Sequence, residues 1–181
     1  MEIDGPVFSA WRAEGRPLAL LDIREKPEVD GGHAAGAILL PMNQVPDRLD
    51  ALPRDVALVV YCAAGARSYG VAHYLRDQGF ADAWSLAGGF GELLAHGTEE
   101  RRPPRGVPFG LLTPVRLTAE AARARGLNAP DKGLPATIQE VAETPDGLRY
   151  AVRITTSQGA ARIDGLSEAE LEPIGRTPRR R

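Results

Sequence analysis

Residues 56–79 read VALVVYCAAGARSYGVAHYLRDQG and contain a complete strand, loop and helix. Val56–Tyr61 is rich in β-branched residues and apolar on both faces, which predicts a central strand of a parallel sheet. Ser68–Gln78 has apolar residues at helical spacing and is followed by Gly79, which predicts an amphipathic helix with a glycine stop. Between them lies a loop of small residues that starts with Cys62, the single cysteine of the chain. The stretch predicts an α/β fold with this cysteine at the end of a buried strand.

The loop YCAAGARS has the composition of a backbone nest for an anion. N–H groups of a tight loop and of the following helix start point toward one place and stabilise negative charge there. Such surroundings lower the pKa of a thiol and favour the nucleophilic thiolate. A lone cysteine is more often a buried structural residue, but the position after a strand favours Cys62 as the catalytic nucleophile. The expected substrate-binding residues are the rest of the loop: Ala63, Ala64, Gly65, Ala66, Arg67 and Ser68.

Further short segments extend the pattern before residue 98. Leu18–Ile23 and Ala81–Leu86 are candidate strands, and Gly91–His96 is a candidate helix. Strands that alternate with helices predict a parallel sheet with helices on both faces.

The sequence pattern changes after residue 97, where the alternation of strand and helix patterns ends. Thr98–Pro108 is charged and contains proline, which is typical of a linker. Short strand-like segments follow, with a TPDG turn at Thr144–Gly147 that predicts a hairpin, and together they indicate a small β-barrel. The tail GRTPRRR has no apolar residue to bury. We therefore predict an α/β domain at 1–97, a linker at 98–108, a small all-β domain at 109–174 and a basic disordered tail at 175–181.

Composition and charge narrow the classes of function. The net charge is −2, and the basic excess of the second half lies in the linker and tail, so no nucleic-acid partner is expected. No apolar run is long enough to span a bilayer and the N-terminus has no secretory pattern, so we expect no membrane association and a cytoplasmic location. One cysteine excludes an internal disulfide and a multi-thiolate metal site. A backbone nest stabilises charge at the sulfur without a metal or cofactor, and we expect neither.

Three ordered segments resemble the rhodanese family. The first, Leu20–Pro41, contains Asp-x-Arg, a glutamate, Gly-His-x-x-Gly-Ala and a closing proline; the second is the Cys62 loop; the third, Ala83–Gly97, contains Leu-x-Gly-Gly. The resemblance covers about the first 97 residues and implies a sulfurtransferase in which Cys62 carries sulfane sulfur as a persulfide. Implied substrates are a small donor, thiosulfate or a persulfide, and a thiophilic acceptor, cyanide or a thiol.

The length of the loop separates two chemistries found on this fold. Sulfur-transferring members have six loop residues counted from the cysteine, whereas related phosphatases use Cys-x5-Arg. Cys62-x4-Arg67 is the short form, which disfavours a phosphatase. Ala63 stands where many members carry arginine, so the pocket has fewer cations and efficient use of thiosulfate is in question.

Supporting roles follow from the same resemblance. Arg67 either braces the loop or contacts an anionic substrate, and both remain open. Asp22 and Arg24 are expected to form an ion pair that frames the loop. His33 belongs to a Gly-His turn and is expected to be structural instead of a base for Cys62.

Residues 109–174 resemble small SH3-like barrels. With only Phe109 and Tyr150 as aromatic residues, this region lacks the groove for proline-rich peptides and the platforms for nucleic acid. Three possible roles remain for this region: a cover over the active site, a docking surface for a protein sulfur donor or acceptor, or an oligomer contact. The alternative to a free-standing enzyme is therefore a sulfur carrier that is loaded only by a protein partner docked through the barrel.

Overall fold

The computed structural model describes residues 1–156 and 159–174 and divides the chain into two compact units, Met1–Arg102 and Pro103–Arg181. Each unit is described by itself. The predicted tail at 175–181 lies outside the described residues. Within the described part, no helix has the length and apolar character needed to cross a membrane.

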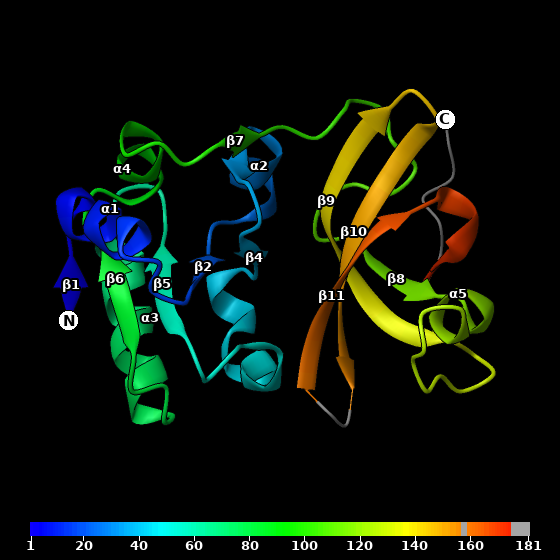
Figure 1. Cartoon of the computed structure of the whole chain (residues 1–181), viewed down its shortest axis with the longest axis horizontal. Helices are drawn as coiled ribbons and strands as arrows, with labels where there is room; N and C mark the ends of the chain where they lie inside the picture. Colours follow the sequence, from blue (N-terminus) through cyan, green and yellow to red (C-terminus); the bar gives the residue numbers. More distant parts are fainter. Residues whose placement is uncertain (157–158, 175–181) are drawn as a thin grey trace. The chain divides into compact units, whose positions relative to one another are not determined.

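The first unit contains the parallel sheet that the sequence predicts, and this sheet has five strands (Figure 1). Every residue of its middle strand is buried, which fits a segment that is apolar on both faces. The strands, in spatial order, are β1 (Glu2–Ile3), β6 (Ala83–Leu86), β5 (Ala57–Tyr61), β2 (Leu18–Asp22) and β4 (Ile38–Leu39).

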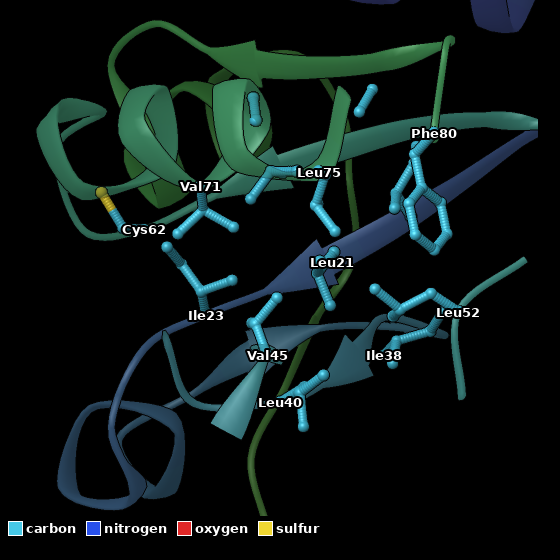
Figure 2. Packing of buried hydrophobic residues seen from close by; sticks show 14 residues of the cluster. Leu21, Ile23, Ile38, Leu40, Val45, Leu52, Cys62, Val71, Leu75 and Phe80 are labelled. Atoms are coloured by element: carbon cyan, nitrogen blue, oxygen red, sulfur yellow. The ribbon is translucent and has the colours of Figure 1, made fainter. Parts of the chain in front are cut away.

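Helical segments cover both faces of this sheet. On one face, alternate residues of β5 pack with Val71 and Leu75 of the long helix α3 (Figure 2). On the other face, Tyr61 stacks on Phe90 at a centroid distance of 6.2 Å. The segments are α1 (Gly5–Ala13), α2 (Lys26–Asp30), η1 (Met42–Gln44), η2 (Pro46–Ala51), α3 (Ala66–Asp77) and α4 (Gly89–Ala95).

The start of the predicted linker is part of the first unit. Strand β7 (Glu100–Arg101) pairs with β3 (His33–Ala34) in a small antiparallel sheet, and the Ala35 N–H donates to the carbonyl of Glu99 at 2.8 Å. The linker predicted at 98–108 therefore needs correction at its first residues. A two-residue strand held by backbone hydrogen bonds has no side-chain period from which it could be predicted.

The second unit is built on a five-stranded antiparallel sheet, in agreement with the predicted all-β class of this region. Strands β9 and β10 form the hairpin expected at Thr144–Gly147, and the last strand, β12, lies beside the first, β8. The short helix α5 was not predicted. The elements are β8 (Pro114–Leu117), α5 (Ala119–Arg123), β9 (Leu134–Thr144), β10 (Gly147–Thr156), β11 (Gly159–Leu166), η3 (Glu168–Glu170) and β12 (Leu171–Pro173).

Candidate active site

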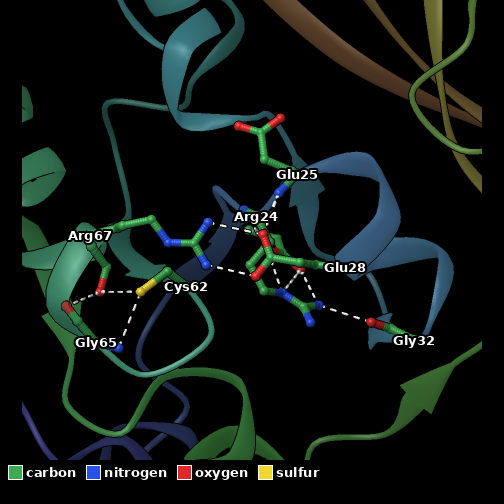
Figure 3. A network of polar contacts seen from close by, with 9 residues as sticks. Arg24, Glu25, Glu28, Gly32, Cys62, Gly65 and Arg67 are labelled. Atoms are coloured by element: carbon green, nitrogen blue, oxygen red, sulfur yellow. Dashed lines mark hydrogen bonds and ion pairs between the residues drawn. The ribbon is translucent and has the colours of Figure 1, made fainter.

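The Cys62 loop leaves the carboxyl end of β5 and closes on itself before α3 (Figure 3). The Cys62 Sγ accepts a hydrogen bond from the Gly65 N–H at 3.1 Å and lies 3.8 Å from the Ser68 Oγ. The same hydroxyl donates to the carbonyl of Gly65 at 2.8 Å. Gly65 has a φ of 102°, in the left-handed region that favours glycine. The loop therefore wraps backbone donors around the sulfur, and Cys62 is only 1% exposed.

Two opposing influences act on the Cys62 thiol. Burial is the largest and raises its pKa. The backbone N–H groups of Ser68, Ala64 and Gly65 and the Ser68 hydroxyl act in the other direction. Together they outweigh burial, so the pKa of Cys62 lies below the ordinary value of a cysteine thiol. A larger fraction of the side chain is therefore thiolate at neutral pH.

The Ser68 hydroxyl provides a test of this balance. Because the Ser68 hydroxyl lies beside the sulfur and favours the thiolate, Ser68→Ala is expected to raise the pKa of Cys62 and to slow its alkylation at neutral pH. The measurement is the rate of alkylation by iodoacetamide as a function of pH. Ser85→Ala is the matched control, since it removes a hydroxyl that lies 2.9 Å from the Ser68 Oγ and leaves the Ser68 hydroxyl itself in place. Superimposable profiles for Ser68→Ala and wild type would contradict the assignment.

Arg67 turns from the loop toward α2 and pairs with Glu28. Its two terminal nitrogens donate to the two carboxylate oxygens at 2.9 and 2.7 Å. This pairing lowers the pKa of Glu28 to about 2 and raises that of Arg67. Of the two roles left open for Arg67, the bidentate contact favours bracing of the loop.

Asp22 and Arg24 form a buried ion pair on the Phe90 side of the sheet. The Asp22 carboxylate accepts from the Arg24 side chain at 2.7–3.2 Å, and Arg24 also donates to the carbonyl of Gly32 at 2.9 Å. The guanidinium lies 3.9 Å from the centroid of the Phe90 ring. The Phe90 N–H in turn donates to the carbonyl of Cys62 at 2.8 Å. The pair is thus connected to the cysteine through Phe90.

The Leu-x-Gly-Gly segment contacts the cysteine directly, which the sequence did not reveal. Gly89 has a φ of 62°, and a Cβ at this position would meet the Cys62 carbonyl oxygen at 2.4 Å. No other residue could bring this backbone so close. The two adjacent glycines of the sequence indicate a close backbone approach. That they approach Cys62 follows only from the pairing of β5 with β6.

The other residues singled out in the sequence differ in solvent exposure: the loop alanines are exposed, whereas His33 is buried. Ala63, Ala64 and Ala66 are exposed on the outer side of the loop. His33 lies buried in β3, with its Nδ1 3.2 Å from the carbonyl oxygen of Ala34. The structure thus brings Cys62, its loop and Asp22–Arg24 together, while their chemical roles stay predictions.

Comparisons with known proteins agree with this geometry. The model of the rhodanese-like domain matches residues 7–96. A protein of Allochromatium vinosum named sulfurtransferase is 38% identical over 96 residues, which are 53% of this chain and 90% of that protein. The thiosulfate sulfurtransferase GlpE of Coxiella burnetii is 32% identical over 90 residues, 49% of this chain and 84% of that protein.

A solved structure adds the fold. The rhodanese-like domain of an Anabaena protein superimposes with a TM-score of 0.51 at 26% identity, covering 60% of this chain and 85% of that one. The resemblance seen in the three sequence segments is therefore confirmed. Through its first unit, the chain belongs to the rhodanese-like family of sulfurtransferases.

Proposed function

We propose that the first unit is a sulfurtransferase in which Cys62 takes up sulfane sulfur and passes it on as a persulfide. The observation that carries this proposal is the hydrogen bond that the Cys62 Sγ accepts from the Gly65 N–H at 3.1 Å. Donors that stabilise a thiolate can also stabilise the terminal sulfur of a persulfide, which is anionic. Ala63, Ala64, Gly65, Ala66, Arg67 and Ser68 then form the substrate-binding loop.

The reaction has two displacement steps. The Cys62 thiolate attacks the sulfane sulfur of the donor, the bond from that sulfur to the rest of the donor breaks, and sulfite leaves when the donor is thiosulfate. A nucleophilic acceptor then attacks the terminal sulfur, and the Cys62 thiolate leaves. With cyanide the product is thiocyanate. The persulfide bond formed in the first step is broken in the second, so the cysteine is restored without a second thiol.

Intact-mass measurement tests both steps. Treatment with a sulfane donor is expected to add the mass of one sulfur, and a cyanide chase is expected to remove it with formation of thiocyanate. A mass that stays unchanged with every small donor, in protein that retains its fold, would overturn the proposal of a free-standing enzyme.

A second candidate function is a sulfur carrier loaded only by a protein partner. The nearly complete burial of Cys62 favours it, because a protein donor could open the loop as it docks. We propose that residues 109–174 form the SH3-like barrel used for this docking. The chain passes through the short 3-10 helix η3 directly into β12, and β12 lies beside β8. This arrangement supports a barrel of this type.

Truncation after Arg102 separates the two candidates. The cut keeps β7 and its pairing with β3, which a cut after Gly97 would remove. For a free-standing enzyme, we expect residues 1–102 to take up sulfur from small donors with a kcat/KM within about twofold of the full chain. A docked carrier would take up no sulfur from small donors even as the full chain, would be loaded by a protein persulfide donor, and would lose that loading after truncation to folded residues 1–102. Circular dichroism checks that the shortened chain folds.

A further inference from the structure

Two pairs of oppositely charged side chains lie near Cys62. Arg67 pairs with Glu28, and Arg24 pairs with Asp22. Each pair is bidentate, so each guanidinium directs its donors at a carboxylate. The sum of these four charges is zero at neutral pH.

Arg67 is the cation that matters for a substrate. Its guanidinium interacts electrostatically with Cys62, and its side chain is 34% exposed. Glu28 nevertheless holds two of its nitrogens, and the Glu28 pKa of about 2 keeps this carboxylate ionised throughout the neutral range. In Figure 3 the guanidinium lies between Cys62 and Glu28. An incoming anion therefore meets an arginine whose charge is already balanced.

Arg24 offers no second free cation. It is 4% exposed and bound to Asp22, to the carbonyl of Gly32 and to the face of Phe90. The lowered pKa of Cys62 also owes most to backbone N–H groups. Dipoles of this kind stabilise one negative charge at the sulfur without supplying a counter-ion for another.

Three exposed residues of the loop carry no charge. Ala63, Ala64 and Ala66 present methyl groups to solvent beside the buried sulfur. A sulfonate group of thiosulfate placed there would find neither a free cation nor a side-chain hydrogen-bond donor among these three residues. An uncharged organic group would meet methyl groups instead.

We propose that Glu28, by pairing with Arg67, makes the Cys62 site selective for sulfane donors that carry one negative charge and an uncharged organic group. Organic thiosulfonates and persulfides share this chemistry, whereas thiosulfate is a dianion. Glu28 is thus a positioning residue that sets specificity through Arg67. The inference rests on the proposed sulfur transfer through Cys62.

Methanethiosulfonate and thiosulfate form a matched pair of probes, because a methyl group in the first replaces one charged oxygen in the second. With methanethiosulfonate, the Cys62 thiolate bonds to the sulfane sulfur, the sulfur–sulfur bond of the donor breaks, and methanesulfinate leaves with the electron pair. The products are a Cys62 persulfide and a sulfinate. The leaving groups, sulfite and methanesulfinate, differ in basicity, but this difference is common to all variants. A change of the kcat/KM ratio between variants therefore reports on charge and on the methyl group.

The test compares this ratio in wild-type full-length protein and in Glu28→Gln. The substitution keeps the size of the side chain but releases the positive charge of Arg67 toward the site. We expect kcat/KM for thiosulfate, relative to methanethiosulfonate, to rise about tenfold, mainly through a lower KM. The gain is expected to shrink at high salt. Glu28→Asp retains the carboxylate and should stay within about threefold of wild type.

Asp30→Asn is the matched control, because it removes one negative charge from the same helix at a residue that pairs with Lys26. An equal rise in this variant would overturn the role of Glu28. So would a ratio that stays unchanged in Glu28→Gln while both donors load Cys62. Failure of both donors to add sulfur to folded wild-type protein would instead overturn the sulfur-transfer proposal itself. The three results are distinguishable in one set of assays.

Discussion

Cys62→Ser is expected to abolish sulfur uptake and thiocyanate formation, with activity at least about a thousandfold below that of the wild type. The reason is chemical, because a serine hydroxyl at this position is neither ionised at neutral pH nor able to form a persulfide. The loop should stay intact, since the Gly65 N–H can donate to the new Oγ as it does to Sγ. The measurement is intact mass after treatment with thiosulfate or methanethiosulfonate, followed by a cyanide chase.

Because the chain has a single cysteine, this variant also removes every thiol from the protein. Any remaining sulfur adduct would then have to sit on another type of group. Near-ultraviolet circular dichroism serves as the control for the fold, since Tyr61 directly precedes Cys62 and is completely buried. Retained transfer in folded Cys62→Ser would contradict the persulfide mechanism.

Asp22→Asn is expected to lower the free energy of unfolding of the first unit by about 3–5 kcal/mol. The substitution keeps the shape of the side chain but leaves the Arg24 guanidinium, 4% exposed, without its counter-charge. Removal of one partner from a buried ion pair costs more than the pair itself contributes, because the remaining charge stays away from water. Sulfur uptake should fall as well, since Arg24 packs on Phe90 and Phe90 binds the carbonyl of Cys62.

Urea unfolding followed by tryptophan fluorescence measures this effect selectively. Both tryptophans, Trp11 and Trp84, lie in the first unit and contact each other at a centroid distance of 5.5 Å. The double variant Asp22→Leu with Arg24→Met is the control, because it removes both charges at similar volume. It should recover part of the lost stability, and the unpaired carbonyl of Gly32 explains why recovery is incomplete. A single variant as stable as wild type would show that the pair is not effectively buried.

The two predictions concern different parts of one connected site. Cys62 supplies the reacting atom, whereas Asp22 acts through Arg24 and Phe90 on the backbone that holds it. We therefore expect Cys62→Ser to lose activity without loss of stability, and Asp22→Asn to lose both. If both variants lost stability and neither lost activity, the separate roles assigned to Cys62 and Asp22 would be contradicted.

The sequence alone determined the central features of the first unit. The strand β5, the helix α3 and the loop that joins them follow from apolar runs, helical spacing and one glycine, all of which act over short distances along the chain. Cys62 could be singled out for the same reason, since its place after a buried strand is a local property. The hairpin of β9 and β10 followed likewise from its turn residues.

Only the tertiary structure decided what surrounds the cysteine. Arg67 and Glu28 are 39 positions apart, and nothing in the local pattern tells which carboxylate an arginine will meet. Gly89 and Phe90 reach the Cys62 backbone because β6 lies beside β5, and β7 extends the first unit by pairing with β3. Periodicity encodes which face of an element is buried, whereas contacts between distant segments depend on how the elements are ordered in the sheet. The charge balance at the site, and with it the expected choice of donor, therefore emerged only from the folded chain.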